Sequence, residues 1–236
     1  MIVLACETST LLGSVAVLEN NRVLAVAESM RQGSHSEVLN QFVEKALADA
    51  GKNLNDVDLF ATGIGPGSFT GIRICLNTIK SFSYCFNKPV TGVNSLLNLA
   101  YQAHFVKSDL AANLPIVPMI NAYKNMVYTA TYKFDGKQLT EVRAPSVVRV
   151  QNLASYITEK SLICGDGFST YQNYFDPQLK LLLHRDENVA DEPHARTLGL
   201  LAQQQPSLLW GELLPLYLRA SEAEENLQGI KYQPLI

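Results

Sequence analysis

The sequence predicts an α/β protein of two lobes, each containing a mixed β-sheet flanked by helices. Two observations predict this class. Short apolar or alternating segments, typical of strands, are interspersed with segments of helical periodicity, and the order of these elements in the first half of the chain begins again in the second half. The composition is that of a globular protein, with 47% hydrophobic and 17% charged residues. With 236 residues the chain can bury one large core or two modest ones.

Charge and cysteine pattern limit the classes of function. The formal net charge is -3, whereas domains that bind nucleic acid unaided usually carry a basic face, so we expect no direct nucleic-acid binding by this chain alone. The four cysteines, Cys6, Cys75, Cys85 and Cys164, lie in apolar segments without C-x-x-C spacing, which predicts buried free thiols and a cytoplasmic location. No segment reaches the roughly 20 apolar residues of a bilayer span, so we expect no membrane anchoring.

The first half predicts three strands followed by alternating helices and strands. An Asn20-Asn21 turn separates two alternating stretches, Ser34 and Glu37 have capping-box spacing at the start of a helix, and Gly51 is placed to end that helix. The predicted elements are strands at 1–7, 13–18 and 22–27, a helix at 35–50, a strand at 58–64, a helix at 69–86, a strand at 89–93 and a helix at 95–105. This order suits a mixed sheet with helices on its faces.

The second half repeats this order in weaker form. Its predicted elements are strands at 115–121, 126–134 and 137–142, helical segments at 150–159 and 193–205, and two short strands at 162–164 and 179–183. Two copies of a ribonuclease-H-like unit are typical of the actin-like architecture, with lobes at 1–105 and at 106–236 and a tail that could return to the first lobe. One larger α/β domain without internal symmetry is the alternative that the pattern leaves open.

A glycine-rich turn at residues 63–73 joins a predicted strand to a predicted helix. Such a junction exposes backbone N–H groups at the positive end of a helix, where an anion can bind, and Ser68 or Thr70 can cap the helix. The turn has neither the Walker pattern nor the dinucleotide fingerprint with its acidic residue. The chemistry alone therefore leaves phosphate binding and a purely structural turn open.

The helix that follows this turn is apolar over about half of its circumference or more. One sheet face does not easily cover so broad a stripe. The helix is therefore either enclosed within its own domain or partly in contact with a partner protein. The residues of the stripe are Phe69, Ile72, Ile74, Cys75, Leu76, Ile79, Phe82, Cys85 and Phe86.

The sequence Gly65-Pro66-Gly67-Ser68-Phe69-Thr70-Gly71-Ile72-Arg73 after a strand resembles the TsaB family, also called YeaZ. Further features match in order along the whole chain. They are Glu7-Thr8-Ser9-Thr10, His35-Ser36-Glu37, Asn121-Ala122-Tyr123, Val127-Tyr128, Gly165-Asp166-Gly167 and Pro215-Leu216-Tyr217-Leu218-Arg219. The glycine motif is specific to the family, and the other features support it.

The resemblance implies a two-lobed actin-like protein without chemistry of its own. In the family it pairs with a larger relative, TsaD, and with the ATPase TsaE, in a complex that transfers threonylcarbamoyl to the adenosine beside the anticodon of ANN-decoding tRNAs. ATP, Mg²⁺ and the catalytic metal then belong to the partner subunits, and this chain would hold no cofactor or metal. A homodimer through the same surface is also implied, and no direct tRNA binding by this chain alone is expected.

The resemblance also implies which surface meets the partner. In the family, the first two helices of the N-terminal lobe pack against those of TsaD or of a second copy. The residues assigned to this interface are His35, Leu39, Phe42, Ser68, Phe69, Ile72, Arg73, Leu76 and Ile79. The catalytic relative holds its metal through an H-x-x-x-H pair, but here the position four after His35 is Leu39, so we expect no metal site.

The hairpins that receive phosphate and Mg²⁺ in active actin-like ATPases are altered in this chain. Glu7, Thr8, Ser9 and Gly13 would be a vestigial phosphate loop in the first lobe. In the second lobe Asn121 stands where the family usually has aspartate, and the hairpin lacks its glycine. An amide carries no charge to hold a metal, which argues against an independent ATP site.

A stand-alone enzyme is the alternative to a partner subunit. It would be an actin-like ATPase or a metallopeptidase-like hydrolase, supported only by the ancestral fold. A peptidase needs a metal pair or a nucleophile with its base, and the sequence identifies neither.

Overall fold

The structure is a computed structural model in which residues 1–30, 35–220 and 227 are described, the side chains of 35–37 and 108 excepted. The chain divides into two compact units. Unit 1 consists of Met1–Asn98 and Glu192–Leu216, and unit 2 of Leu99–Asp191 and Tyr217–Ile236. The sequence placed the division at residue 105, whereas the contacts divide the chain inside α3 (Ser95–Val106). The segment Glu192–Leu216, which returns to unit 1, includes the whole helix α8 (Ala195–Ala202).

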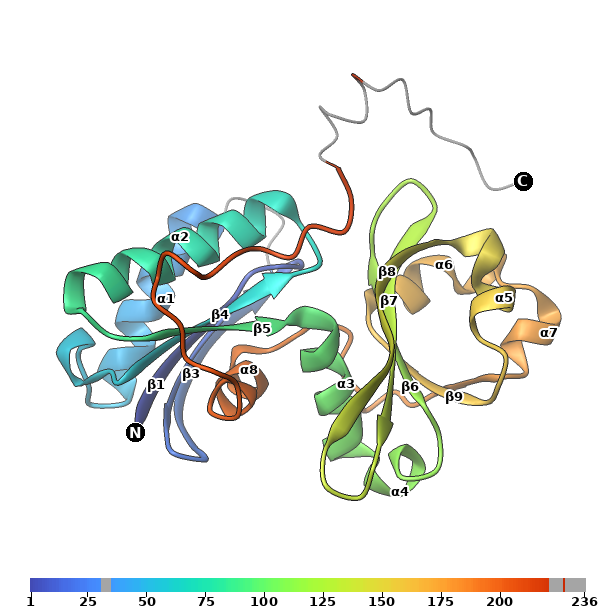
Figure 1. Ribbon diagram of the computed structural model, residues 1–236, viewed down its shortest axis with the longest axis horizontal. Helices are drawn as coiled ribbons and strands as arrows, with labels where there is room; N and C mark the ends of the chain where they lie inside the picture. The colour runs from blue at the N-terminus through green and yellow to red at the C-terminus, as the bar shows by residue number, and fades with distance from the viewer. Residues whose placement is uncertain (31–34, 221–226, 228–236) are drawn as a thin grey trace. The chain divides into compact units, whose positions relative to one another are not determined.

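Unit 1 is built on a five-stranded mixed sheet of order β3-β2-β1-β4-β5 (Figure 1). Its elements are β1 (Ile2–Glu7), β2 (Leu12–Glu19), β3 (Arg22–Met30), α1 (His35–Asp49), η1 (Leu54–Asp56), β4 (Leu59–Gly65), α2 (Phe69–Phe86), β5 (Val90–Asn94) and α8 (Ala195–Ala202). Strands β1 to β3 are antiparallel, and β1, β4 and β5 are parallel. The predicted boundaries are close to these, but the Ser34–Glu37 capping box lies outside the described residues.

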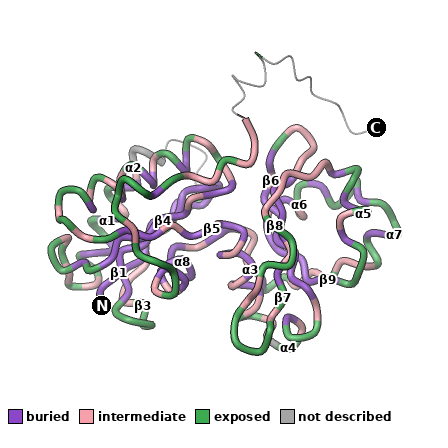
Figure 2. Tube along the Cα trace, viewed as in Figure 1, coloured by how far each residue is buried: buried purple, intermediate pink, exposed green. Residues whose placement is uncertain are grey.

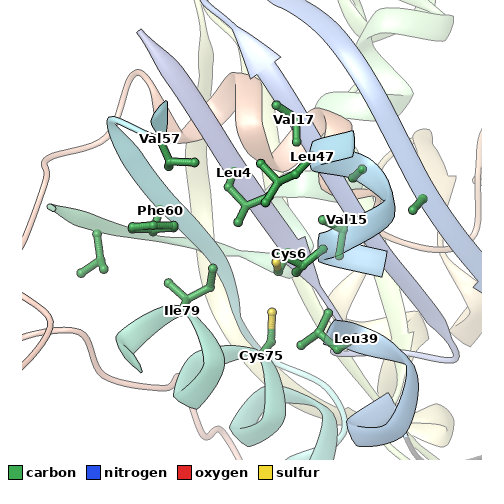
Figure 3. Packing of buried hydrophobic residues seen from close by; sticks show 14 of the residues in the cluster. Leu4, Cys6, Val15, Val17, Leu39, Leu47, Val57, Phe60, Cys75 and Ile79 are labelled. Carbon is green, nitrogen blue, oxygen red and sulfur yellow. The ribbon is translucent and has the colours of Figure 1, made fainter. Parts of the chain in front are cut away.

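The two faces of this sheet are covered by different helices. Along β1, Leu4 and Cys6 face the core formed with α1 and α2, where Cys6 points toward Cys75 of α2 (Figure 3). Ala5 faces α8, where a Cβ added to Gly199 would come within 3.3 Å of the Ala5 side chain. Both central strands, β1 and β4, are therefore buried nearly along their whole length (Figure 2). A continuous apolar run is what a strand covered on both faces requires.

The segment at 206–216 crosses the β5 edge of the sheet, and we call it the strap. Leu208 and Val90 exchange backbone hydrogen bonds of 2.7 and 3.0 Å, and the Leu216 N–H donates to the Ile64 carbonyl at 2.8 Å. Leu213 is 1% exposed and belongs to the core under α1 and α2. The strap therefore completes the core of unit 1 and covers part of its sheet edge.

Unit 2 repeats the sheet of unit 1, with strand order β10-β9-β6-β7-β8. Its elements are α4 (Ser108–Ala111), β6 (Ile116–Asn121), β7 (Met126–Phe134), β8 (Leu139–Arg149), η2 (Val150–Asn152), α5 (Leu153–Tyr156), β9 (Ser161–Cys164), α6 (Asp166–Tyr171), η3 (Gln172–Tyr174), α7 (Pro177–Lys180) and β10 (Leu183–Arg185). Read from the other edge, the order β8-β7-β6-β9-β10 matches unit 1 strand for strand. The duplicated, actin-like architecture predicted from the sequence is confirmed, and the single asymmetric domain is wrong.

Several predicted features of the two units were wrong in detail. The segment at 179–183 is not a strand, because Asp176 caps the short helix α7 there and β10 starts only at Leu183. Helix α6 was not predicted. Cys85 is an exposed thiol on the outer face of α2, while the other three cysteines are buried as expected. Among the helices in the described part of the chain, none is long and apolar enough to cross a membrane.

Candidate functional site: the first hairpin and the glycine turn

The glycine turn connects β4 directly to α2, and Ser68 is the residue that caps this helix. The Ser68 hydroxyl accepts a hydrogen bond from the Gly71 N–H at 3.2 Å, and the Ser68 carbonyl accepts from the Ile72 N–H at 2.9 Å. This confirms Ser68, rather than Thr70, as the cap. The first turn of α2 is therefore fixed by its own residues.

The turn packs on the hairpin that follows β1. The Ser68 N–H donates to the Ser9 carbonyl at 2.7 Å, and the Thr8 hydroxyl donates to the Gly71 carbonyl at 2.7 Å. A Cβ on Gly67 or Gly71 would fall well inside contact distance of the Ser9 or Thr8 carbonyl oxygen. These glycines are therefore required by a close backbone approach, and the Ser68 N–H binds the chain's own carbonyl. This geometry favours the structural interpretation of the turn over phosphate binding.

Glu7 ends β1 directly beneath the turn and is completely buried. Its Oε1 accepts from the Ser9 N–H at 2.9 Å, and its Oε2 accepts from the Ser95 hydroxyl at 3.3 Å. Removal from water raises the pKa of this carboxyl group, and the hydrogen bonds from Ser9, Ser95 and Thr8 act in the opposite direction. Of the vestigial loop predicted from the sequence, Glu7, Thr8 and Ser9 thus meet at the glycine turn. Gly13 lies in β2, opposite Ser29 of β3.

The residues assigned to the partner interface have three different environments. Leu39, Ile72, Leu76 and Ile79 are buried in the core of unit 1, so their side chains support α1 and α2 from within instead of lying on a surface. Phe42 and Phe69 are half-buried, and Ser68 and Arg73 are exposed, with the Arg73 guanidinium 5.8 Å from the centre of the Phe69 ring. The side chain of His35, the first residue of α1, lies outside the described residues.

Unit 2 has a corresponding hairpin at the end of β6. Asn121 accepts through Oδ1 from the Tyr123 N–H at 2.8 Å and from the Tyr171 hydroxyl at 3.0 Å. The carboxyl group comes from the neighbouring strand end, where Asp166 Oδ1 accepts from the Asn121 N–H at 2.9 Å. Tyr123 begins three consecutive residues with positive φ, a conformation in which non-glycine side chains are uncommon. Unit 2 therefore keeps one half-buried carboxyl group beside this hairpin, at the start of α6, which follows β9.

Comparison with known proteins places the chain in a family. The family model described as "TsaD: tRNA N6-adenosine threonylcarbamoyltransferase" matches residues 29–227. The tRNA threonylcarbamoyladenosine biosynthesis protein TsaB of Haemophilus influenzae is 34% identical over 239 residues, which cover 96% of this chain and 97% of the relative. The chain belongs to the TsaB family. The TsaB of Bacillus subtilis is 26% identical over 95% of this chain and 96% of its own length.

A solved structure of the TsaB family has the same fold. YeaZ from Pseudomonas aeruginosa superposes with a TM-score of 0.76 at 26% identity, covering 92% of this chain and 99% of that chain. The sequence motif at 63–73 had indicated this family, and the indication is confirmed. Within the described residues, no three His, Cys, Asp or Glu side chains lie close enough together to hold a metal ion.

Sequence reasoning missed two site residues of this TsaB-family chain. Ser95, the first residue of α3, is 88 positions from Glu7, and a serine at a helix start signals a cap before it signals a long-range contact. Asp166 was recognised only as part of the Gly165-Asp166-Gly167 motif, without a role. An isolated Gly-Asp-Gly sequence does not show that the Asp166 carboxyl group accepts a hydrogen bond from Asn121, 45 positions away.

The half-buried carboxyl group of Asp166 makes unit 2 of this TsaB-family chain sensitive to pH. Burial, followed by the field of Asp191, raises the pKa of Asp166 to about 6, while the Asn121 N–H acts against this shift. A raised acid pKa means that the folded state binds the proton more tightly. The contribution of Asp166 to the free energy of unfolding is therefore fully present below the unfolded pKa of about 3.9. It is lost as the pH rises to about 6, by roughly 3 kcal/mol in total.

Asp166→Asn should remove this loss, which urea unfolding of both proteins between pH 4 and 8 would measure. Asp109→Asn, an exposed carboxyl group on α4, is the control and should leave the profile of the wild type unchanged. Parallel profiles for wild type and Asp166→Asn would contradict the assignment.

Proposed function

We propose that this chain is the non-catalytic partner subunit of a TsaD-type threonylcarbamoyltransferase, acting with TsaE in the modification of the adenosine beside the anticodon of ANN-decoding tRNAs. The observation that carries the proposal is the full-length relationship to proteins named tRNA threonylcarbamoyladenosine biosynthesis protein TsaB, at up to 34% identity with 96% of the chain covered. The match to the TsaD family model supports pairing with a relative of the same fold, because related folds can pack with pseudo-twofold symmetry.

The exposed stripe of α2 supports a docking role for this helix. With the apolar side of α2 enclosed in unit 1, the residues that face outward recur at helical spacing and are mainly polar. They are Thr70, Arg73, Asn77, Ser81, Tyr84 and Cys85. Neighbouring α1, which contacts α2, exposes Gln41, Glu44 and Lys45. A polar rim around half-buried aromatic side chains such as Phe42 and Phe69 is typical of a reversible interface between separately folded proteins.

The state of the first hairpin supports a subunit without an ATP site of its own. In an actin-like ATPase the acidic residue at this position must reach Mg²⁺ or its water, but here Glu7 is completely buried. We therefore propose that nucleotide and metal chemistry belong to the partner subunits. A stand-alone ATPase or peptidase would need an accessible acid or nucleophile at this site, and no observation favours one.

Reconstitution tests the proposal. The cognate TsaD and TsaE, threonylcarbamoyl-adenylate and an unmodified ANN-decoding tRNA are incubated with and without this chain, and threonylcarbamoyladenosine is measured by mass spectrometry. We expect modification to require the chain, and the isolated chain to hydrolyse neither ATP nor peptides. Equal modification without the chain would overturn the proposal.

Arg73→Glu is expected to weaken the pairing with TsaD at least about tenfold, since reversing a charge in an interface typically costs more than about 1.4 kcal/mol. Titration calorimetry or co-purification with TsaD measures the change. Arg196→Glu is the matched control, because Arg196 is exposed on α8, the helix on the opposite sheet face of unit 1. Equal effects of both variants would contradict α2 as the docking surface.

A further inference from the structure

The carboxyl group of Glu7 lies in a cradle made by three separate elements. Its two oxygens accept hydrogen bonds from the Ser9 N–H of the hairpin and the Ser95 hydroxyl at the start of α3. The third side of the cradle is the backbone of Gly63 in β4, where a Cβ would overlap both carboxyl oxygens. Glycine at position 63 is therefore explained by the space that this carboxyl group occupies.

The cradle has the chemistry of an oxyanion site. A backbone N–H and the hydroxyl group of Ser95, the first residue of α3, both donate to one carboxylate, and such donors at a helix start are what proteins use for phosphate and carboxylate ligands. Helix α3 has 12 residues, so its N-terminus carries a developed dipole. The carboxylate is that of Glu7, a side chain of the same chain that is 0% exposed. Among the described residues, no basic group contributes to the environment of Glu7, and the titratable neighbour that feels its charge is the buried thiol of Cys6.

We propose that the Glu7 carboxyl group is an internal ligand, which occupies the oxyanion position of the first hairpin and so closes unit 1 to phosphate. The same group ties β1, β4 and α3 together at the base of the glycine turn. This inference concerns the isolated chain and goes beyond the proposed function, because it would hold whether or not the chain pairs with TsaD. Glu7 is then a positioning residue, and the hydrogen-bond donors of the hairpin are occupied by a side chain of the same chain.

Chemical rescue tests the proposal on the full chain. Glu7→Ala removes the carboxyl group and leaves the Ser9 and Ser95 donors lining a cavity, and buried cavities of this kind bind small molecules that match their lining. We expect its Tm to fall by about 5 to 10 °C, as a loss of a few kcal/mol does in a chain of this size. Sodium acetate up to about 0.2 M should then raise the Tm of the variant by several degrees in a saturable way.

Four controls separate an oxyanion site from general effects. Sodium chloride at equal ionic strength and acetamide, which has one acceptor instead of two, should raise the Tm of Glu7→Ala by less than acetate does. The wild type should show no saturable response to acetate. Leu4→Ala creates a cavity in the same unit that is lined by apolar groups only, and acetate should not rescue it. Equal shifts with acetate, chloride and acetamide would overturn the proposal.

A second measurement uses the wild type and so does not depend on the folding of a variant. The backbone amide signal of Ser9 is followed by ¹H–¹⁵N NMR while inorganic phosphate is added to about 50 mM at constant ionic strength. We expect no saturable shift, because Glu7 already accepts from this N–H. A saturable shift of the Ser9 and Ser95 signals would show that the site is open to phosphate and would refute the internal ligand. Neither experiment requires the partner, so their failure is distinct from failure of the proposed function.

Discussion

Gly71→Ala should lower the free energy of unfolding by at least about 3 kcal/mol, at the upper end of the range for overpacking a buried site. The added Cβ would fall far inside contact distance of the Thr8 carbonyl oxygen, and the Thr8 hydroxyl is itself bonded to the Gly71 carbonyl. Because both contacts involve main chain, neither group can move without displacing the first turn of α2 or the hairpin after β1. Urea unfolding followed by circular dichroism measures the change.

Gly211→Ala is the control for this substitution. Gly211 lies in the strap without a positive φ, and apart from its two chain neighbours no described residue has an atom within 4 Å of the position that a Cβ would take, so alanine should be neutral or slightly stabilising there. If Gly71→Ala were as stable as Gly211→Ala, the close approach of hairpin and helix would not exist. A loss of stability in both variants would instead mean that alanine also disturbs the folded strap at position 211, because its effect on the unfolded chain is stabilising.

Leu213→Ala should destabilise unit 1 by about 3 kcal/mol, the middle of the range for truncating a buried leucine. Leu213 is 1% exposed, belongs to the core with α1 and α2, and lies against Gly92 of β5, where a Cβ would come within 2.8 Å of its side chain. Leucine at this position fills the space left by the glycine. The free energy of unfolding in urea is again the measurement.

The adjacent residue supplies the matched control for the strap. Leu214 is 68% exposed, so Leu214→Ala should change the free energy of unfolding by less than about 0.5 kcal/mol. A similar cost for the two substitutions would mean that the strap does not pack with the register seen in the structure. A negligible cost for both would mean that the strap is not part of the core of unit 1.

The elements of unit 1 could be predicted from the sequence because their signals are local. An apolar run, a glycine turn and a capping serine lie within about 15 residues of one another around β4 and α2. In unit 2 local signals competed. The apolar run around Leu181 suggested a strand, although Asp176 and Pro177 form a helix start, and the helix prevailed because Leu179 is buried against α5.

The candidate site was predicted only in part, because its contacts join distant positions. The sequence identified Glu7 and the glycine turn separately, but the space that Glu7 occupies depends on Gly63, 56 positions away, and on Ser95, 88 positions away. For α2, the breadth of the apolar stripe was correctly noticed. Leu76 and Ile79 were nevertheless assigned to a partner interface, because one sequence does not show that they pack in one core with residues of α1 and with Leu213 of the strap.

The discontinuity of unit 1 has a consequence for the order in which the chain can fold during synthesis. Residues 1–98 leave the ribosome first, but α8 and the strap follow only after Asp191, when the main body of unit 2 is already complete. Until Leu213 emerges, the Gly92 side of the nascent sheet has no cover and its apolar core remains open to water. Unit 2 can therefore fold before unit 1 is complete. The N-terminal part of the chain then depends on chaperones for a longer time than any later part.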